Sequence, residues 1–437
     1  MTAPSENEHH QPRESRADSL DDLDSRGQPE TVSDFDDVPT TNPRHFGETI
    51  GGEAPAWLEF DEHGQQIVDE KPPRASGPGI WESIAWIALF VFTELAVGVV
   101  WTTIAATLHF VSTGENPGRE QLQEIVTRQM PYLLAVVKGF EVLLALVLIR
   151  WRFGPKAFRL LGFRPIPLTH VGIAALIVLP TAVMSGQLYA LFLQFWEWLA
   201  QFAPFLADWN AGSSVETVQE MARTAPWGLL VLAVAVFPAL NEEFLFRGLI
   251  GRGLVGRYGI VFGIGLTSIL FAAVHMSPVH AAALIPLAIV MHVAYLSSGS
   301  IWLPVLIHFV NNAMSVIMMI WAVRSAEEAP EMAQSPLDFS LEPLILFSSA
   351  FCVAMAIWMF WRMRVEWRIP DGSRWDHAAP AIDSSDPSRG EPAKSRSWAL
   401  PAVSLAVSLI VFAVSYVIVT LRLVSEAQAD VGVFLGQ

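Results

Sequence analysis

The sequence predicts an all-α fold, a polytopic transmembrane bundle of about eight or nine helices that follows a disordered acidic tail. Of its 437 residues, 52% are hydrophobic and 16% are charged, and the mean hydropathy is +0.40. The apolar residues are gathered into long blocks, and a block of about twenty apolar residues is long enough to cross a bilayer as a helix. The composition therefore indicates a multi-pass membrane protein.

Nine apolar blocks are long enough to be considered as spans. Short loops between residues 226 and 297 obscure the boundaries there, so the number of helices is eight or nine. The blocks lie at residues 84–111, 130–150, 170–194, 226–255, 259–276, 279–297, 301–323, 341–361 and 398–421.

The formal net charge of -16 comes mostly from the segment before Pro78, which is rich in Asp, Glu, Ser and Pro and poor in aromatic residues. Such a segment cannot bury enough apolar surface to offset the entropy of ordering, so residues 1–79 are predicted to be a disordered cytoplasmic tail. The first thirty residues lack the pattern of a signal peptide, and insertion is expected to begin near Ile84. Residues 80–365 then form the helical core, residues 366–397 a cytoplasmic linker, and residues 398–437 an additional helix with a short tail.

Basic residues follow three of the apolar blocks, which predicts orientation through the positive-inside rule. The segment Ser297–Ser300, which follows the sixth block, carries no charged residue and therefore gives no information about orientation. The amino terminus is therefore predicted to be cytoplasmic, in the plasma or inner membrane of the cell, with the carboxyl terminus outside. The basic residues are Arg150, Arg152, Lys156, Arg159 and Arg164 after the second block, Arg252 and Arg257 after the fourth, and Arg362, Arg364, Arg368 and Arg374 after the eighth.

Two classes of function are excluded by composition. Cys352 is the single cysteine, so neither an intramolecular disulfide nor a cage of several thiolates can form. There is no basic stripe interleaved with aromatic residues, and no nucleic-acid partner is expected. The expected partners are the lipid bilayer and a protein or peptide substrate.

The most informative polar group is Glu242-Glu243, followed four residues later by Arg247, within an apolar block. Ionisable groups in hydrocarbon cost at least a few kcal/mol each on insertion scales, so they mark a functional site by default. Glu243 and Arg247 share a helix face and can form an ion pair, which is the structural interpretation of this motif. Glu242 has no partner in its own turn and is predicted to be catalytic.

His275 closes the next apolar block, in Phe271-Ala-Ala-Val-His275. By itself it would be interpreted as a helix-end residue that makes a cap or an interfacial hydrogen bond. If the fourth and fifth blocks form a hairpin that turns at Gly259, Glu242 and His275 each lie roughly 25 Å from the turn at about 1.5 Å per residue. The carboxylate and the imidazole are then expected to meet inside the membrane.

His308 and Asn312 lie four residues apart in a third block and can point at one substrate atom. Asn311 could take the place of Asn312. The structural interpretation is a polar bridge between helices, worth about half a kcal/mol in a membrane. Because His308 follows the Ser297–Ser300 turn closely, it is expected to be shallower than Glu242 unless the helices tilt.

Other polar residues in the apolar blocks carry weaker signals and are predicted to be structural bridges between helices. They are Glu94, Lys138, Glu141 and His292.

Glu-Glu-x-x-x-Arg at residues 242–247, Phe-x-x-x-His at 271–275 and His-x-x-x-Asn at 308–312 occur in this order at membrane depth. Together they resemble the signature of the CPBP intramembrane protease family, which includes the type II CAAX prenyl endopeptidases and the bacterial Abi proteins. Each motif is weak by itself, whereas three in order are strong. The resemblance covers roughly residues 163–321, and it departs at His292, where relatives commonly carry a small residue, usually glycine.

The resemblance implies an intramembrane endopeptidase for a membrane-associated protein or peptide, including one with a prenylated CAAX-like end. Glu242, assisted by His275, would activate water, and His308 and Asn312 would donate to the oxyanion. Glu243 and Arg247 would support the motif helix.

No cofactor is favoured, because the resemblance leans toward a glutamate-dependent, metal-free mechanism. The family was nevertheless long described as metalloproteases, and a zinc site would use Glu242, His275 and His308. No His-Glu-x-x-His motif places such ligands on one helix face.

A different class of function is a non-proteolytic membrane scaffold, or a carrier coupled to protons or cations, that uses the same buried Glu and His residues. A continuous polar path through other helices would favour the carrier, and the sequence provides little sign of one.

Overall fold

The computed structural model describes residues 59–60, 66–67, 77–206, 214–328, 341–368, 374–376, 391–392 and 397–435. The chain divides into two compact units, Met1–Pro72 and Pro73–Gln437. Within the first unit, an antiparallel pair of two-residue strands is described, β1 (Glu59–Phe60) and β2 (Gln66–Ile67). The rest of the predicted acidic tail, apart from residues 77–79, lies outside the described residues.

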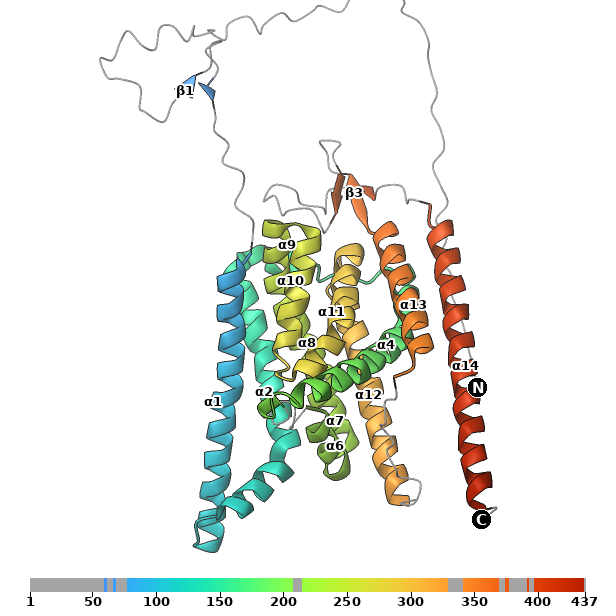
Figure 1. The fold of residues 1–437 in the computed structure, drawn as a ribbon. Helices are drawn as coiled ribbons and strands as arrows, with labels where there is room; N and C mark the ends of the chain where they lie inside the picture. The colour runs from blue at the N-terminus through green and yellow to red at the C-terminus, as the bar shows by residue number, and fades with distance from the viewer. Residues whose placement is uncertain are drawn as a thin grey trace, which may run out of the picture. The chain divides into compact units, whose positions relative to one another are not determined.

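The second unit is built from helices (Figure 1), which confirms the predicted all-α class. The long helices cover the predicted apolar blocks, and two of them extend well beyond: α2 begins 11 residues before its block, and α14 ends 14 residues after its block. The helices are α1 (Ile80–Thr113), α2 (Arg119–Phe153), η2 (Gly154–Lys156), α3 (Ala157–Leu160), α4 (Leu168–Ala200), α6 (Ser214–Thr224), α7 (Trp227–Val231), η3 (Leu232–Val236), α8 (Phe237–Glu243), η4 (Phe244–Gly251), α9 (Arg252–Tyr258), α10 (Ile260–Ala273), α11 (Pro278–Ser298), α12 (Trp302–Glu328), α13 (Pro343–Arg362) and α14 (Ala399–Leu435).

Eight helices in the described part of the chain are long and apolar enough to cross a membrane. The block at residues 259–276 is not one of them. Its helix, α10, has 14 residues and is therefore about 21 Å long at about 1.5 Å per residue, short of a bilayer core of about 30 Å. The described part of the chain thus has eight candidate spans, the smaller of the two predicted numbers, and α10 is a shorter helix that packs beside α11.

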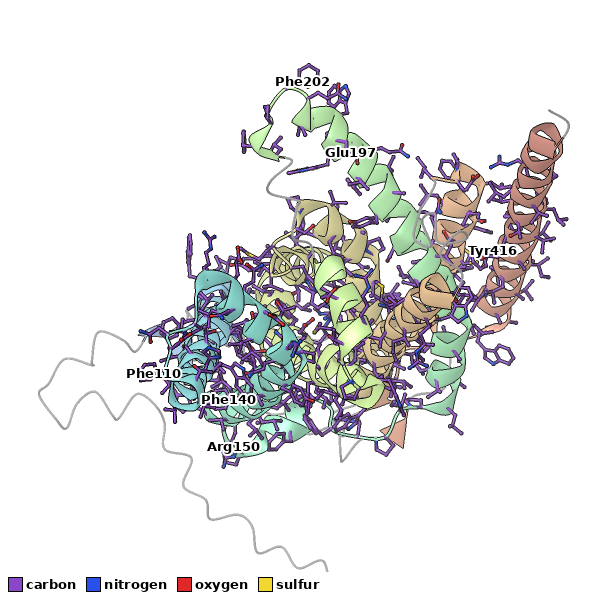
Figure 2. All side chains as sticks on the ribbon, turned by 90° about the horizontal axis from the view of Figure 1, so that it is seen from below. Phe110, Phe140, Arg150, Glu197, Phe202 and Tyr416 are labelled. Atoms are coloured by element: carbon purple, nitrogen blue, oxygen red, sulfur yellow. The ribbon has the colours of Figure 1, made fainter. Side chains whose placement is uncertain are left out.

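The outer faces of the long helices are apolar, as lipid contact requires. Phe202 and Tyr416, labelled in Figure 2, lie at the periphery, and their side chains are 71% and 49% exposed. Phe110 and Phe140 are half exposed on α1 and α2. Exposed aromatic side chains of this kind suit a hydrocarbon solvent, in which a helix needs no polar outer face.

Three short strands follow α13, within the predicted linker. They are β3 (Glu366–Arg368), β4 (Arg374–Asp376) and β5 (Glu391–Pro392), which pair antiparallel in the order β4-β3-β5. The other residues of the linker lie outside the described part of the chain. These strands add a small sheet to one helix end and leave the fold class unchanged.

The basic segments that follow the predicted apolar blocks lie at one end of the bundle. Arg152 at the end of α2 and Arg257 at the end of α9 both donate to the carbonyl of Gly77, at 3.2 and 3.1 Å. Arg152 also pairs with Glu82 in the first turn of α1, at 2.6 Å. The clustering agrees with the pattern used to predict orientation, and the side of the membrane on which this end lies stays a prediction.

A close backbone contact holds the loop after α3 against the turn between α11 and α12. Gly162 accepts a hydrogen bond from the Ile301 amide at 3.1 Å, and the Ser300 hydroxyl donates to the Arg164 carbonyl at 2.6 Å. Gly162 has a φ of +74°, and a Cβ there would lie 2.2 Å from the carbonyl oxygen of Gly299. This contact needs glycine for both backbone conformation and space.

Replacement of Gly162 by alanine should therefore destabilise the fold by at least about 1–3 kcal/mol, because a strained φ is combined with a clash against backbone that cannot move aside. The thermal unfolding midpoint in detergent measures this. Gly172→Ala is the matched control, because a Cβ at that helical position meets nothing within 4 Å. Equal midpoints for the two variants would contradict the proposed contact.

Candidate active site

The first motif lies on a span, Trp227–Tyr258, that is not a regular α-helix. It is π-helical at η3 and η4, and the α-helical segment α8 lies between them. π-Helical turns inside α-helices occur frequently at functional sites. Glu242 and Glu243 are the last two residues of α8, so the two carboxylates lie at the junction between this α-helical segment and the π-helical segment η4.

Pro238 explains part of this irregularity. Proline has no amide hydrogen, so it cannot supply the α-helical donor to the carbonyl of Val234, four residues earlier. The side-chain amide of Asn312 on α12 donates to that carbonyl at 3.0 Å. Asn312 also accepts from the side chain of Asn311 at 3.3 Å. The polar bridge that was the structural interpretation of Asn312 is therefore present.

Glu243 is the centre of a buried polar network. Its Oε1 accepts from Arg247 Nη1 at 2.7 Å and is 2.9 Å from His308 Nδ1. Glu243 and Arg247 are both 0% exposed. Arg247 donates from Nη2 to the carbonyl of Ala288 at 3.0 Å, and its guanidinium lies 4.6 Å from the centre of the Phe271 ring. The network thus joins the motif helix to α10, α11 and α12.

Glu242 has different surroundings from its neighbour. Its side chain is 17% exposed, and its Oε2 lies 3.9 Å from Nε2 of His308. An ionised carboxylate can only accept, so the Nδ1 of His308 donates its hydrogen to Glu243 and Nε2 is the nitrogen that faces Glu242. His308 therefore lies between the two carboxylates.

The sequence placed His308 shallower than Glu242 unless the helices tilt, and left that question open. The 3.9 Å contact shows that the two side chains reach the same depth. Glu242 is followed by the π-helical segment η4, over which the ideal α-helical rise used in that estimate does not apply.

His275 also reaches the same cavity as Glu242, as predicted. Gly259 forms the turn between α9 and α10 with a φ of +79°. His275 follows the end of α10, where its Nδ1 lies 3.1 Å from the carbonyl of Phe271. Nδ1 donates to this carbonyl, which leaves Nε2 as the free nitrogen. Together with Glu242, His275 lines a cavity of about 200 Å³.

Four more polar residues line this cavity: Glu94 on α1, Lys138 and Glu141 on α2, and Asn241 on α8. Lys138 bonds to Glu94 and lies 3.2 Å from Oε2 of Glu141, which also accepts from the amide of Asn241. Three of them were predicted to be structural bridges, and they do bridge helices, but they also border the candidate catalytic carboxylate. The signal was available in the i, i+3 spacing of Lys138 and Glu141 in an apolar block, whereas Asn241 carried none beyond its place next to Glu242.

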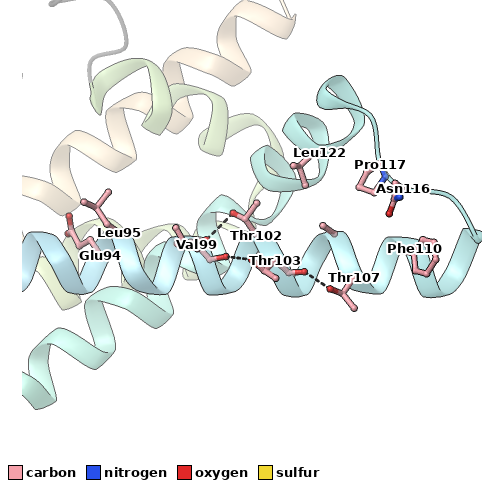
Figure 3. Close-up of a pocket in the computed structure, with 12 residues that line it drawn as sticks. Glu94, Leu95, Val99, Thr102, Thr103, Thr107, Phe110, Asn116, Pro117 and Leu122 are labelled. Carbon is pink, nitrogen blue, oxygen red and sulfur yellow. Dashed lines mark hydrogen bonds between the residues drawn. The ribbon is translucent and has the colours of Figure 1, made fainter.

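A second, larger hollow of about 700 Å³ lies along α1 and the start of α2 (Figure 3). The hydroxyls of Thr102, Thr103 and Thr107 each donate to a carbonyl of their own helix at 2.8–2.9 Å. These threonines therefore offer little unused polarity to the hollow. Glu94 lines both this hollow and the smaller cavity.

His292 does not form the hydrogen-bonded bridge that was predicted for it. The side chain is 0% exposed, and neither ring nitrogen has a hydrogen-bond partner among the described residues. It packs against Gly251 of η4, where a Cβ would lie 2.5 Å from the imidazole. The small residue expected at position 292 is thus replaced by a large one, and space for it exists because residue 251 is glycine.

The described residues contain no group of three or more His, Cys, Asp or Glu side chains arranged to hold a metal ion. Glu242, His275 and His308 are near one another without forming such a group. The metal-free mechanism stays a prediction.

Comparison with known proteins agrees with the motifs. Residues 224–314, about a fifth of the chain, match the family model of the type II CAAX prenyl endopeptidase Rce1-like proteins. The chain is a multi-pass membrane protein, and we refer to residues 224–314, which are similar to this family, as its CAAX-protease-like core. This core contains all three motifs, which confirms the predicted resemblance, although the match is shorter than the predicted extent of residues 163–321. No curated protein and no solved structure matches the chain.

Replacement of Arg247 by methionine should destabilise the CAAX-protease-like core by about 3–5 kcal/mol, because it leaves the buried carboxylate of Glu243 without its cation. Unfolding in detergent measures the loss. Arg128→Met is the control, because Arg128 pairs with Glu124 on the surface of α2, with side chains 75% and 66% exposed, and such pairs contribute about 1 kcal/mol or less. A similar, small effect of both variants would show that the buried pair does not stabilise the core.

Proposed function

We propose that the protein is an intramembrane endopeptidase that hydrolyses a peptide bond of a membrane-associated protein or peptide, with Glu242 as the general base. One observation carries this proposal. The side chain of Glu242 is partly exposed on the wall of a cavity that His275 also lines, while Nε2 of His308 lies 3.9 Å away. The CAAX-protease-like core supplies the reaction class.

In this mechanism Glu242 takes a proton from a water molecule in the cavity, and the water oxygen attacks the carbonyl carbon of the substrate. The proton then passes from Glu242 to the leaving amine as the C–N bond breaks, which returns the carboxylate to its ionised form. His275 orients the water through Nε2, because its Nδ1 is held by the Phe271 carbonyl. No group outside the protein and water is needed to balance these steps.

His308 and Asn312 are proposed to stabilise the oxyanion, and Asn312 has a donor left over from its structural contact. The side-chain amide of Asn312 has two hydrogens, and its contact with Val234 uses one of them. His308 would donate from Nε2 when both ring nitrogens carry hydrogen. A single donor to the oxyanion is typically worth about 3 kcal/mol in the transition state.

The substrate is proposed to carry an apolar anchor, including a prenylated CAAX-like end of the kind named in the description of the matched family. The larger hollow beside α1 adds support, because it is bordered mostly by apolar side chains and shares Glu94 with the smaller cavity.

A carrier coupled to protons or cations is the second candidate. The contacts from Glu94 through Lys138 and Glu141 to Asn241 favour it, because they make a polar path that the sequence barely suggested. In the described residues this path links α1, α2 and α8, and the same groups serve a hydrolase equally well.

Glu242→Gln should abolish peptide cleavage, by at least about a thousandfold, while membrane insertion and thermal stability stay close to wild type. The amide keeps the size of the side chain and removes the base. Membranes that contain either protein are compared by proteomics for new peptide termini near lipid-modified or membrane-spanning ends. Glu197→Gln, which lies on α4 outside the residues lining the cavity, is the control.

The same comparison separates the rival functions. A set of termini that appears with wild type and disappears with Glu242→Gln supports the peptidase. Identical termini in both membranes, together with loss of ion or proton flux in Glu242→Gln, would instead establish the carrier.

Cleavage by the purified protein should persist after dialysis against a strong chelator, with less than about a twofold loss, because a glutamate-activated water needs no metal. Loss of activity that returns with added zinc would replace this mechanism with the metal-dependent one in which Glu242, His275 and His308 are ligands. A known zinc peptidase treated in parallel controls for complete chelation.

A further inference from the structure

An ion pair on α2 lies next to the candidate catalytic carboxylate and is outside all three motifs. Glu141 is 1% exposed, and its Oε2 accepts from both Lys138 Nζ and the Asn241 amide. Asn241 is also 1% exposed and immediately precedes Glu242. A hydrogen-bonded chain therefore runs from α2 to the residue next to the proposed base.

This chain fixes the rotation of α8 about its own axis. Asn241 is bonded to α2, and Glu243, on the other side of Glu242, is bonded to His308 on α12. Because the residues on both sides of Glu242 are anchored to different helices, the direction in which its side chain leaves the helix is determined. Truncation of Asn241 would remove one of the two anchors.

The charges around the cavity are mostly negative. Its lining contains Glu94, Glu141 and Glu242, and Lys138 is the one Lys or Arg side chain among the lining residues. His275 is the lining imidazole. Behind the wall, Glu243, Arg247 and His308 form the buried network described above, in which one carboxylate and one guanidinium offset each other. Lys138 is therefore the cation that offsets the acidic lining.

We propose that Lys138 and Glu141, acting through Asn241, are positioning residues for Glu242 that fix its orientation and set the electrostatic potential at its carboxylate. This inference rests on the proposed function, because it assigns to the α2 pair a role in the reaction that Glu242 performs. It differs from a purely structural bridge, since a bridge would hold the helices together without changing how the base takes up its proton.

The charges of Lys138 and Glu141 have opposite effects on the ionisation of Glu242, so the direction of the shift in the pH profile tests the inference. Lys138→Met removes a positive charge and disfavours ionised Glu242, so the rising acidic limb of the plot of kcat/KM against pH moves to higher pH. Glu141→Gln removes a negative charge and moves this limb to lower pH. Each shift should be on the order of one pH unit, and the limb of the double variant should lie between those of the single variants.

The experiment measures cleavage of a quenched fluorescent peptide with a farnesylated cysteine, in detergent or liposomes, across the pH range. Glu141→Gln is nearly isosteric and keeps an oxygen that accepts from Asn241, so a fold defect is least expected there. Should Lys138→Met fail to fold, Glu141→Gln and the double variant still carry the sign test. Asn241→Leu breaks the chain without changing charge and should lower kcat more than it raises KM.

Glu124→Gln and Arg128→Met are the matched controls, because they neutralise an exposed ion pair on the same helix. Their profiles should coincide with wild type. Shifts of Lys138→Met and Glu141→Gln in the same direction, or no shift in either while Glu242→Gln is inactive, would overturn the inference and leave the proposed function standing. Cleavage by Glu242→Gln itself would instead overturn the proposed function.

Discussion

The buried contact between Glu243 and Arg247 is the interaction on which the rest of the core depends. Both side chains are fully buried, and the two opposite charges pair with each other at 2.7 Å inside the membrane. Arg247 reaches the Ala288 carbonyl on α11 and the Phe271 ring on α10, while Glu243 holds His308 on α12. These contacts bring residues of all three motifs to one depth. The motif helix therefore works first as a junction between helices.

Irregular helical geometry provides the space for this junction. Pro238 removes an amide hydrogen and exposes the Val234 carbonyl, which the Asn312 side chain then satisfies from α12. Gly251 lets His292 pack directly against η4. In the first case proline leaves a carbonyl without its α-helical donor, and Asn312 supplies a donor. In the second case the missing Cβ of Gly251 leaves space, and the His292 side chain fills it.

The sequence predicted much of this arrangement, because apolar blocks set the helices and Gly259 set the hairpin depth of His275 opposite Glu242. It could not predict the contact of Asn241 with Glu141, which depends on α2 and α8 being neighbours, a fact that lies in the packing and not in either segment. The sequence also overestimated the length of α10, because an apolar block shows that a helix is buried or in lipid but does not show that the helix crosses the whole membrane. The sequence left the depth of His308 open, because that depth depends on helix tilt and on the π-helical turns of the span that carries Glu242, neither of which an apolar pattern reveals.

This packing explains why Glu242 and Glu243, although adjacent in the sequence, have different surroundings. Neighbouring residues on a helix point about 100° apart, so two consecutive carboxylates must face different surroundings. Glu243 faces the helix junction, where it is 0% exposed and pairs with Arg247, whereas Glu242 faces the cavity and is 17% exposed. A base that must accept a proton from water cannot also be locked in a dry ion pair. Under the proposed function, the doubled glutamate separates two requirements: Glu243 holds the helices together and Glu242 reacts, while His308 lies between the two carboxylates.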